Sequence, residues 1–264
     1  MRKGIVLSIM TLTFVLILTP AGQAQYFKFD NAASNQQIDD EVKAILKFFG
    51  TIVGGGLFHT ADLHSVAGAD IGLKGVLANV PEDFKSLPVF ADEDFVGLAF
   101  LHGSLGLPGN FELLGRFFYF PLGADADENI SPPRSDSRGG VTLIGAGLKY
   151  GLIQAPGLPK VAIIGAYHAL FVPQEFDFGT VGTLSIKGVA SYSVPLLTLY
   201  VGAGVDISSL KLNDPFLDGK RFTENQTHFT VGAKVTVFPL VHVSGSYNVS
   251  EFSSVDLGIG ISFR

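Results

Sequence analysis

The segment Leu101-His102-Gly103-Ser104 contains the residue types of a nucleophilic enzyme. Residues two apart in a β-strand point to the same face, so His102 and Ser104 are neighbours if this segment is a strand. A histidine within hydrogen-bond reach can take the proton of a serine hydroxyl and make the oxygen a nucleophile. No carboxylate that orients the imidazole can be assigned from the sequence, and two polar residues on one strand face need no catalytic role. His102 and Ser104 are therefore candidate catalytic residues, but we predict that the chain is not an enzyme.

A second set of residues suited to chemistry consists of charged side chains and histidines that share one face of each predicted strand. The set is Asp70, Lys74, Glu112, Arg116, Lys149, His168, Lys187, Asp206, His228, Lys234, His242 and Asp256. Buried charges persist in proteins when they are paired. If this face lines the inside of a barrel, the set forms either structural ion pairs or a polar path for a solute.

The elements that carry these residues alternate apolar and polar side chains. Between residues 228 and 237, for example, apolar Phe229 and Val231 flank polar Thr230. A strand with this period has one apolar and one polar face. In a soluble sandwich the apolar faces form the core, whereas in a transmembrane barrel they face lipid and the polar faces line the lumen.

The N-terminus favours the transmembrane interpretation. Basic Arg2 and Lys3 precede an apolar run over 5–18, and small residues up to Ala24 follow. This pattern is typical of a secretory signal peptide, which we place at residues 1–24. No later stretch reaches the roughly 18 apolar residues of a membrane helix, yet the mean hydropathy is positive. A β-barrel reconciles these facts, because it spreads its apolar surface over alternate residues.

Composition excludes several other classes of protein. The chain has no cysteine, so neither a disulfide nor a thiolate metal site stabilises the fold. Its formal net charge of −6 argues against a nucleic-acid partner. It contains no phosphate loop, dinucleotide fingerprint or zinc-binding pattern. We therefore predict no cofactor and no metal.

The fold class that follows is all-β, an antiparallel up-and-down transmembrane barrel of about ten strands within residues 64–264. The strands are expected at 64–80, 94–107, 111–122, 139–154, 159–172, 179–194, 196–212, 225–238, 241–250 and 253–263. Short turns alternate with longer polar loops, and outer-membrane barrels have short periplasmic turns and longer outer loops. The long loops are therefore expected outside. A twelve-strand barrel that also uses 51–60 and one further strand is the alternative.

Residues 25–63 are expected to form a linker and a helical plug or lid. Val42, Ile45 and Phe49 fall at helical spacing, which predicts a helix over 36–49 that Gly50 ends. Glycine is frequent on the predicted inward faces and leaves room for another backbone. The helix is thus predicted either to fill the lumen, where aromatic residues such as Phe100, Phe118 and Phe120 meet it, or to lie on the periplasmic face.

Several segments resemble known outer-membrane proteins. The segment from Val255 to Phe263 resembles the C-terminal strand signature that the barrel-assembly machinery reads, although Arg264 follows the closing aromatic residue. The blocks 53–64 and 68–75 resemble an uncharacterised family of exported barrels, which implies fold and location but no activity. A more distant architectural likeness is to plugged barrels of the fatty-acid-transporter type. The His-x-Ser pattern at 102–104 resembles that of outer-membrane lipid A deacylases, which the rest of the chain does not match.

Together these patterns predict a monomer in the bacterial outer membrane. The leading hypothesis is a passive channel or transporter for small or hydrophobic solutes, gated by the N-terminal plug. The alternatives are a structural or adhesion barrel that acts through its outer loops, and a lipid-modifying enzyme. The expected partners are outer-membrane lipids and lipopolysaccharide, the assembly machinery through Val255 to Phe263, and an unidentified small solute.

Overall fold

The computed structural model describes residues 35–86, 90, 94–121, 140–171, 179–212 and 221–263. The predicted signal peptide at 1–24 and most of the predicted linker lie outside these ranges.

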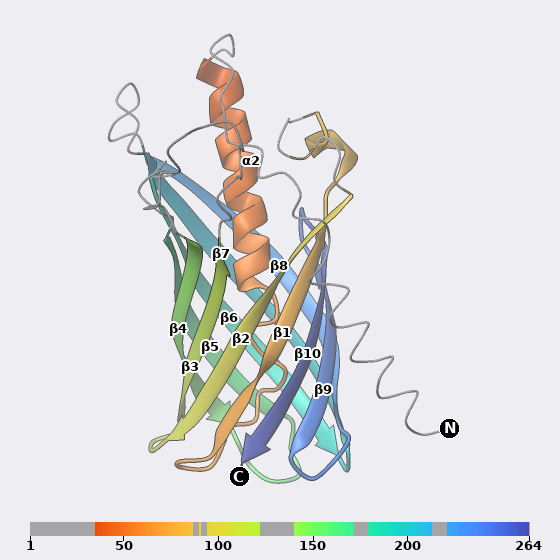
Figure 1. Cartoon of the computed structure of the whole chain (residues 1–264). Coiled ribbons are helices and arrows are strands. Elements are labelled where there is room, and N and C mark those ends of the chain that lie inside the picture. The colour runs from red at the N-terminus through yellow and green to blue at the C-terminus, as the bar shows by residue number, and fades with distance from the viewer. Residues whose placement is uncertain are drawn as a thin grey trace, which may run out of the picture.

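Ten antiparallel strands form a closed barrel (Figure 1). They are β1 Ala69–Asn79, β2 Phe95–Leu107, β3 Phe111–Pro121, β4 Gly140–Ile153, β5 Lys160–Phe171, β6 Gly179–Val194, β7 Leu197–Leu212, β8 Arg221–Thr236, β9 Val241–Val249 and β10 Ser254–Phe263. Each strand pairs with the next, and β1 pairs with β10 from Ala69 opposite Phe263 to Ala78 opposite Ser254. The predicted fold class is confirmed. Because the first and last strands pair along their length, the twelve-strand alternative is wrong.

The two faces of the barrel wall differ sharply in burial. In β10, Leu257 and Ile259 are 53% and 45% exposed, whereas the neighbouring Asp256 is 3% exposed. The same alternation recurs in the other strands, so the outer surface is a belt of aliphatic and aromatic side chains. A continuous apolar surface of this extent is unfavourable in water and favourable in lipid. None of the helices in the described ranges is long and apolar enough to cross a membrane.

The two ends of the barrel also differ. The turns β2–β3, β4–β5, β6–β7 and β8–β9 are short and lie at one end with the start of β1 and the end of β10, which we call the short-turn end. The strand ends that the longer connections join lie at the other end, which we call the long-loop end. There, Lys85 donates hydrogen bonds to Glu82 (2.8 Å) and Asp94 (2.5 Å) within the β1–β2 connection. These two carboxylates stabilise the ammonium form and raise the pKa of Lys85.

Two strand starts differ from the prediction by four residues or more, whereas the other boundaries agree within two residues. β1 begins at Ala69 and not at 64, because Ala67 has a φ of 64° and breaks the extended chain. Residues just before β1 instead bond to β2, where Ala67 N–H donates to the carbonyl of Gly106. β8 begins four residues early, at Arg221, because its first residues continue the ladder with β7 as far as the pair Lys211–Arg221.

The helix α2, Asn35–Gly54, runs down into the barrel from the long-loop end (Figure 1). Its inner half packs on the wall, with Leu46 in a cluster with Leu210 and Phe222. The prediction that Gly50 ends the helix is wrong. A Cβ at Gly50 would lie 2.8 Å from Ser208 Oγ of β7, so this glycine permits close helix–wall contact. The inner half of the helix lies in the lumen, its outer half projects at the long-loop end, and no part of it lies across the short-turn end (Figure 1).

Residues 55–68 continue from the helix through the lumen to β1 at the short-turn end. Together, residues 35–68 form what we call the lumen segment. Among the aromatic residues expected to meet the helix, Phe100 is fully buried and Phe118 packs beside it. Phe120, however, is 42% exposed, because it lies close to the rim of β3.

Candidate functional site

The buried polar residues of the wall form a candidate site around the lumen segment. All twelve charged residues and histidines of the predicted lumen set are buried, each at most 7% exposed. They make neither one continuous row of ion pairs nor one open polar path. Many of them bind the backbone of the lumen segment instead, at three successive levels.

The first level is the C-terminal end of α2. Arg116 Nη1 donates a hydrogen bond to the carbonyl of Val53 (2.7 Å), and Lys187 Nζ donates one to the carbonyl of Gly54. The last carbonyls of a helix have no partner within the helix and carry the negative end of its dipole. Two buried cations therefore satisfy and neutralise this helix end. The Arg116 guanidinium also lies over the Phe100 ring, 5.3 Å from its centre.

Lys187 belongs to a buried group with Asp206 and His228. Its Nζ lies 3.5 Å from Asp206 Oδ2 and contacts His228 Nε2, while His228 Nδ1 lies 2.9 Å from Asp206 Oδ2. The ammonium is thus held by one carboxylate, one imidazole and the helix carbonyl. A Cβ at Gly54 would collide with the Asp206 carboxylate, so only glycine fits where the helix end meets this group.

The second level is the turn that follows the helix. Gly56 has a φ of 56°, the left-handed conformation that glycine adopts readily after a helix. Its N–H donates to Asp256 Oδ2 (2.6 Å), which also accepts from Asn248 Nδ2 (2.8 Å) and Ser246 Oγ (3.0 Å). Ser246 and Asn248 of β9 therefore position the Asp256 carboxylate of β10 to bind the backbone of the lumen segment.

The third level holds residues 61–64. The N–H groups of Ala61 and His64 donate to Ser191 Oγ (2.9 Å) and Glu112 Oε2 (3.0 Å). Lys149 Nζ donates to the Asp62 carbonyl and lies 3.3 Å from Glu112 Oε1. Irregular backbone inside a membrane protein needs such partners, because it has no ladder of its own. Side chains of the wall supply these hydrogen-bond partners to residues 61–64.

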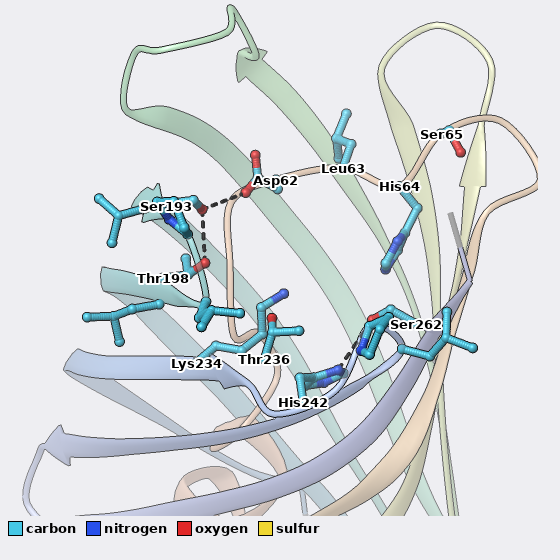
Figure 2. A pocket seen from close by; sticks show the side chains of 16 residues that line it. Asp62, Leu63, His64, Ser65, Ser193, Thr198, Lys234, Thr236, His242 and Ser262 are labelled. Carbon is cyan, nitrogen blue, oxygen red and sulfur yellow. Dashed lines mark hydrogen bonds between the residues drawn. The ribbon is translucent and has the colours of Figure 1, made fainter.

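Residues 62–65 border two cavities at the short-turn end. The larger, about 560 Å³, is lined by Asp62, His64, Ser193, Lys234, His242 and Ser262 among others (Figure 2). The smaller, about 430 Å³, lies toward the β2–β3 turn and Lys160. The lumen segment thus leaves water-accessible space at this end of the barrel.

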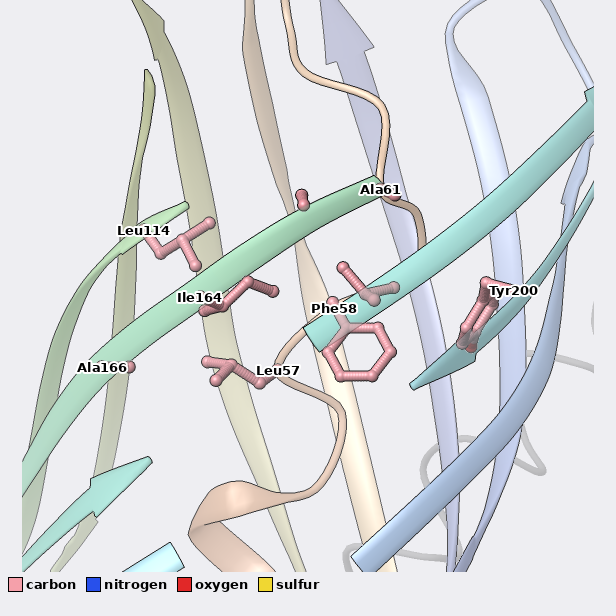
Figure 3. Close-up of a cluster of buried hydrophobic side chains, with 9 residues drawn as sticks. Leu57, Phe58, Ala61, Leu114, Ile164, Ala166 and Tyr200 are labelled. Carbon is pink, nitrogen blue, oxygen red and sulfur yellow. The ribbon is translucent and has the colours of Figure 1, made fainter. Parts of the chain in front are cut away.

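Deeper in the lumen the contacts are apolar. Leu57, Phe58 and Ala61 pack in one cluster with wall residues that include Ile164 and Tyr200 (Figure 3). The rings of Phe58 and Tyr200 meet edge to face, with centres 5.9 Å apart. A Cβ at Gly202 would collide with the Phe58 ring, so this glycine leaves the space that the ring fills.

The candidate catalytic pair lies on β2, buried at 2% for His102 and 8% for Ser104. In the strand register, Ser104 is opposite Asp70 and His102 is opposite Arg116. Within the described residues His102 Nδ1 has no hydrogen-bond partner, and neither residue lines the two cavities. The site residues that sequence reasoning missed are backbone groups of 53–64 together with His59, for which only the glycine run at 54–56 gave a signal.

A search of the solved structures found bacterial outer-membrane barrels. The N-terminal barrel domain of Pseudomonas aeruginosa OprF is 15% identical, with 58% of this chain and 98% of that chain covered and a TM-score of 0.34. The attachment invasion locus protein Ail of Yersinia pestis is 12% identical over 75% of this chain and all of its own, with a TM-score of 0.32. The transport unit of the Escherichia coli autotransporter AIDA-I is 11% identical over 88% of this chain and 99% of its own, with a TM-score of 0.39.

These likenesses are too distant to carry an argument about activity. None of the three is a fatty-acid transporter, so they give no support to the likeness with that type of barrel. No curated protein matched the chain. The model of a family of unknown function, DUF6588, matches residues 89–263, from the β1–β2 connection to the end of β10. The chain therefore belongs to the DUF6588 family.

Proposed function

We propose that this protein is an outer-membrane channel for small or hydrophobic solutes that its own lumen segment holds closed. The observation that carries the proposal is the double clamp at the end of α2, where Arg116 and Lys187 bind the carbonyls of Val53 and Gly54. Lys187 is paired with Asp206 of the wall, but both cations also bind backbone carbonyls of the lumen segment. The wall thus holds the segment through contacts that a shift of the segment would break.

The belt of exposed apolar side chains supports a place in the outer membrane, with lipids and lipopolysaccharide as neighbours. In this proposal the chain is exported by the predicted signal peptide, is recognised by the assembly machinery through β10 and works as a monomer. The solute crosses when the lumen segment shifts, along a wall that offers both the charged groups and the apolar surface around Ile164 and Tyr200.

A disulfide lock tests the gate. Thr60 Oγ1 and Ser191 Oγ lie 3.2 Å apart, so Thr60→Cys with Ser191→Cys places two thiols within bonding reach, in a chain without native cysteine. The lock is combined with Lys187→Met, which weakens the clamp. In planar bilayers the triple variant is expected to conduct when reduced and to be silent when oxidised. Equal conductance in both states, with the disulfide shown by mass spectrometry, would refute gating by this segment.

A second candidate is a surface protein that acts through its long-loop end. The observation in its favour is the outer half of α2, which projects at that end with Asp40 and Lys43 exposed (Figure 1). Phe48 packs there against Phe90 and Phe252, so the helix and two loop connections form one unit. If the reduced triple variant folds and never conducts, this second function is favoured.

A further inference from the structure

Three potential metal ligands from distant parts of the chain converge near the short-turn end. His59 comes from the lumen segment, Asp70 from β1 and His242 from β9, and one donor atom of each lies within 4.8 Å of the other two. All three side chains are buried, at 6%, 2% and 3% exposure. Two imidazoles and one carboxylate are a donor set that zinc and related transition metals prefer.

One possible ligand atom of the cluster makes no hydrogen bond. His59 Nε2 is buried and has no hydrogen-bond partner in the described part of the chain. The His59 and His242 rings stack with centres 4.8 Å apart, so they share one side of the cluster. Asp70 Oδ2 accepts a hydrogen bond from Ser262 Oγ (2.5 Å) and lies 3.5 Å from His242 Nδ1. A ligating carboxylate is usually oriented by such an outer partner.

The cluster already faces a cation of the protein. Lys74 Nζ lies 3.1 Å from His59 Nδ1, and the carboxylate of Asp70 attracts the same ammonium. Lys234 and His102 add positive or dipolar groups around His59. A metal ion therefore competes with the Lys74 ammonium for the lone pair of His59, and the three donors draw closer together than they lie now, since zinc–ligand bonds are about 2.0–2.2 Å long.

An ion can reach the cluster from the short-turn end. His242 and Ser262 line the cavity of about 560 Å³, as do His64 and Lys234 (Figure 2). His242 therefore connects water-accessible space with buried Asp70 and His59.

We propose that His59, Asp70 and His242 bind a transition-metal dication such as zinc, and that the bound ion fastens the lumen segment to β1 and β9. The binding itself is independent of channel activity. Only its consequence, a metal-stabilised closed state, rests on the proposed function. The bound ion would connect one ligand of the lumen segment, His59, with two ligands of the wall, Asp70 and His242.

The binding test uses the refolded mature chain without a histidine tag, titrated with zinc chloride by calorimetry. One ion per chain is expected, and magnesium is expected not to bind because it is a hard cation that prefers oxygen ligands. His59→Ala and His242→Ala are expected to weaken zinc binding at least about tenfold, and Ser262→Ala by about tenfold. His168→Ala, which removes a buried histidine outside the cluster, is the matched control and is expected to bind as the parent does.

Lys74→Met provides a gain-of-function variant, since it removes the competing ammonium and is expected to bind zinc more tightly than the parent. The proposal is overturned if the parent binds no zinc, if binding is unchanged in both His59→Ala and His242→Ala, or if Lys74→Met fails to tighten it. In bilayers, zinc is expected to silence Lys187→Met and not its His242→Ala derivative. If zinc binds as expected but no variant conducts, the metal site stands and the channel function fails.

Discussion

The clamp at the end of α2 gives the sharpest test of the closed lumen. Lys187→Met removes the ammonium that binds the Gly54 carbonyl and leaves the side-chain length almost unchanged. Asp206 then retains His228 as a close neighbour, with His228 Nδ1 at 2.9 Å from Asp206 Oδ2. The closed state loses a charged hydrogen bond and retains a buried carboxylate, whereas an open lumen hydrates both groups. The change therefore favours the open state.

The size of the shift follows from the contacts. A hydrogen bond to a charged group contributes about 1.5–3 kcal/mol, and every 1.4 kcal/mol changes a population ratio about tenfold. Lys187→Met is thus expected to raise the ratio of open to closed channels by about tenfold to a hundredfold. For Arg116→Met we expect about tenfold, the lower end. Within the described residues Arg116 Nε and Nη2 lack hydrogen-bond partners, so the closed state does not satisfy this guanidinium fully.

The assay is the open probability of single refolded channels in planar bilayers. Lys211→Met is the control, because Lys211 is an exposed residue near the outer end of β7 and its loss leaves the clamp intact. Circular dichroism and the thermal midpoint show whether each variant still folds. The reasoning is refuted if folded Lys187→Met opens no more often than Lys211→Met.

Three further predictions concern orientation and packing. A membrane-impermeant maleimide is expected to label Asp40→Cys but not Leu158→Cys in intact cells, because these exposed residues lie at opposite ends of the barrel; the reverse pattern would invert the assigned orientation. Gly202→Ala is expected to lower the free energy of unfolding by about 1–3 kcal/mol in a denaturant titration, because its Cβ collides with Phe58. Gly188→Ala is the control and is expected to be nearly neutral, because its Cβ would have only the Ala203 carbonyl nearby, at 4.0 Å. Phe252→Ala empties a fully buried site between Phe48 and Phe84 and is expected to lower the free energy of unfolding by about 3–5 kcal/mol. Proteolysis near α2 is then expected to become faster, and an unchanged cleavage rate would contradict that packing.

The barrel was predictable from the sequence because its pattern is local. A strand with one lipid face and one lumen face alternates residue by residue, so strand number and register follow from the pattern. The predicted strand ends are wrong where the alternation of side chains does not show how far two strands pair. Residues just before β1 include small and polar side chains that fit a strand, and only the φ of 64° at Ala67 and the contact with Gly106 end it there.

The helix shows how a local rule fails against a tertiary contact. Glycine usually marks a helix end because it adopts a left-handed conformation. At Gly50 the helix continues, and the missing side chain accommodates Ser208 of the wall. The residue that does turn the chain is Gly56, two positions after the helix ends. A sequence without alignment offers no means of telling these two glycines apart.

Residues 57–64 and the metal cluster were not predictable for a related reason. This stretch has no periodicity, and its backbone partners come from β3, β4, β6 and Gln154 of the β4–β5 turn. His59 is 11 residues from Asp70 but 183 from His242, as the numbering shows, so no spacing motif connects them. The alternation along each strand identified the lumen-facing wall residues. It does not reveal that their partners are backbone carbonyl and amide groups of the lumen segment.

The wall charges and the lumen segment depend on each other, and this dependence constrains how the proposed channel would open. Without the segment, Arg116 and Lys187 lose the carbonyls of the helix end, and Asp256 loses the Gly56 amide of the following turn. The helix end in turn loses its two cations. Neither part is stable in a dry lumen alone, because an unpaired buried charge costs several kcal/mol. Water therefore enters as the segment leaves, and the cavities beside residues 62–65 are where water already has access. Release is thus expected to begin at the short-turn end, so that hydrogen exchange of the Ala61 and His64 amides precedes that of Gly56; exchange in the opposite order would place the first opening at the helix.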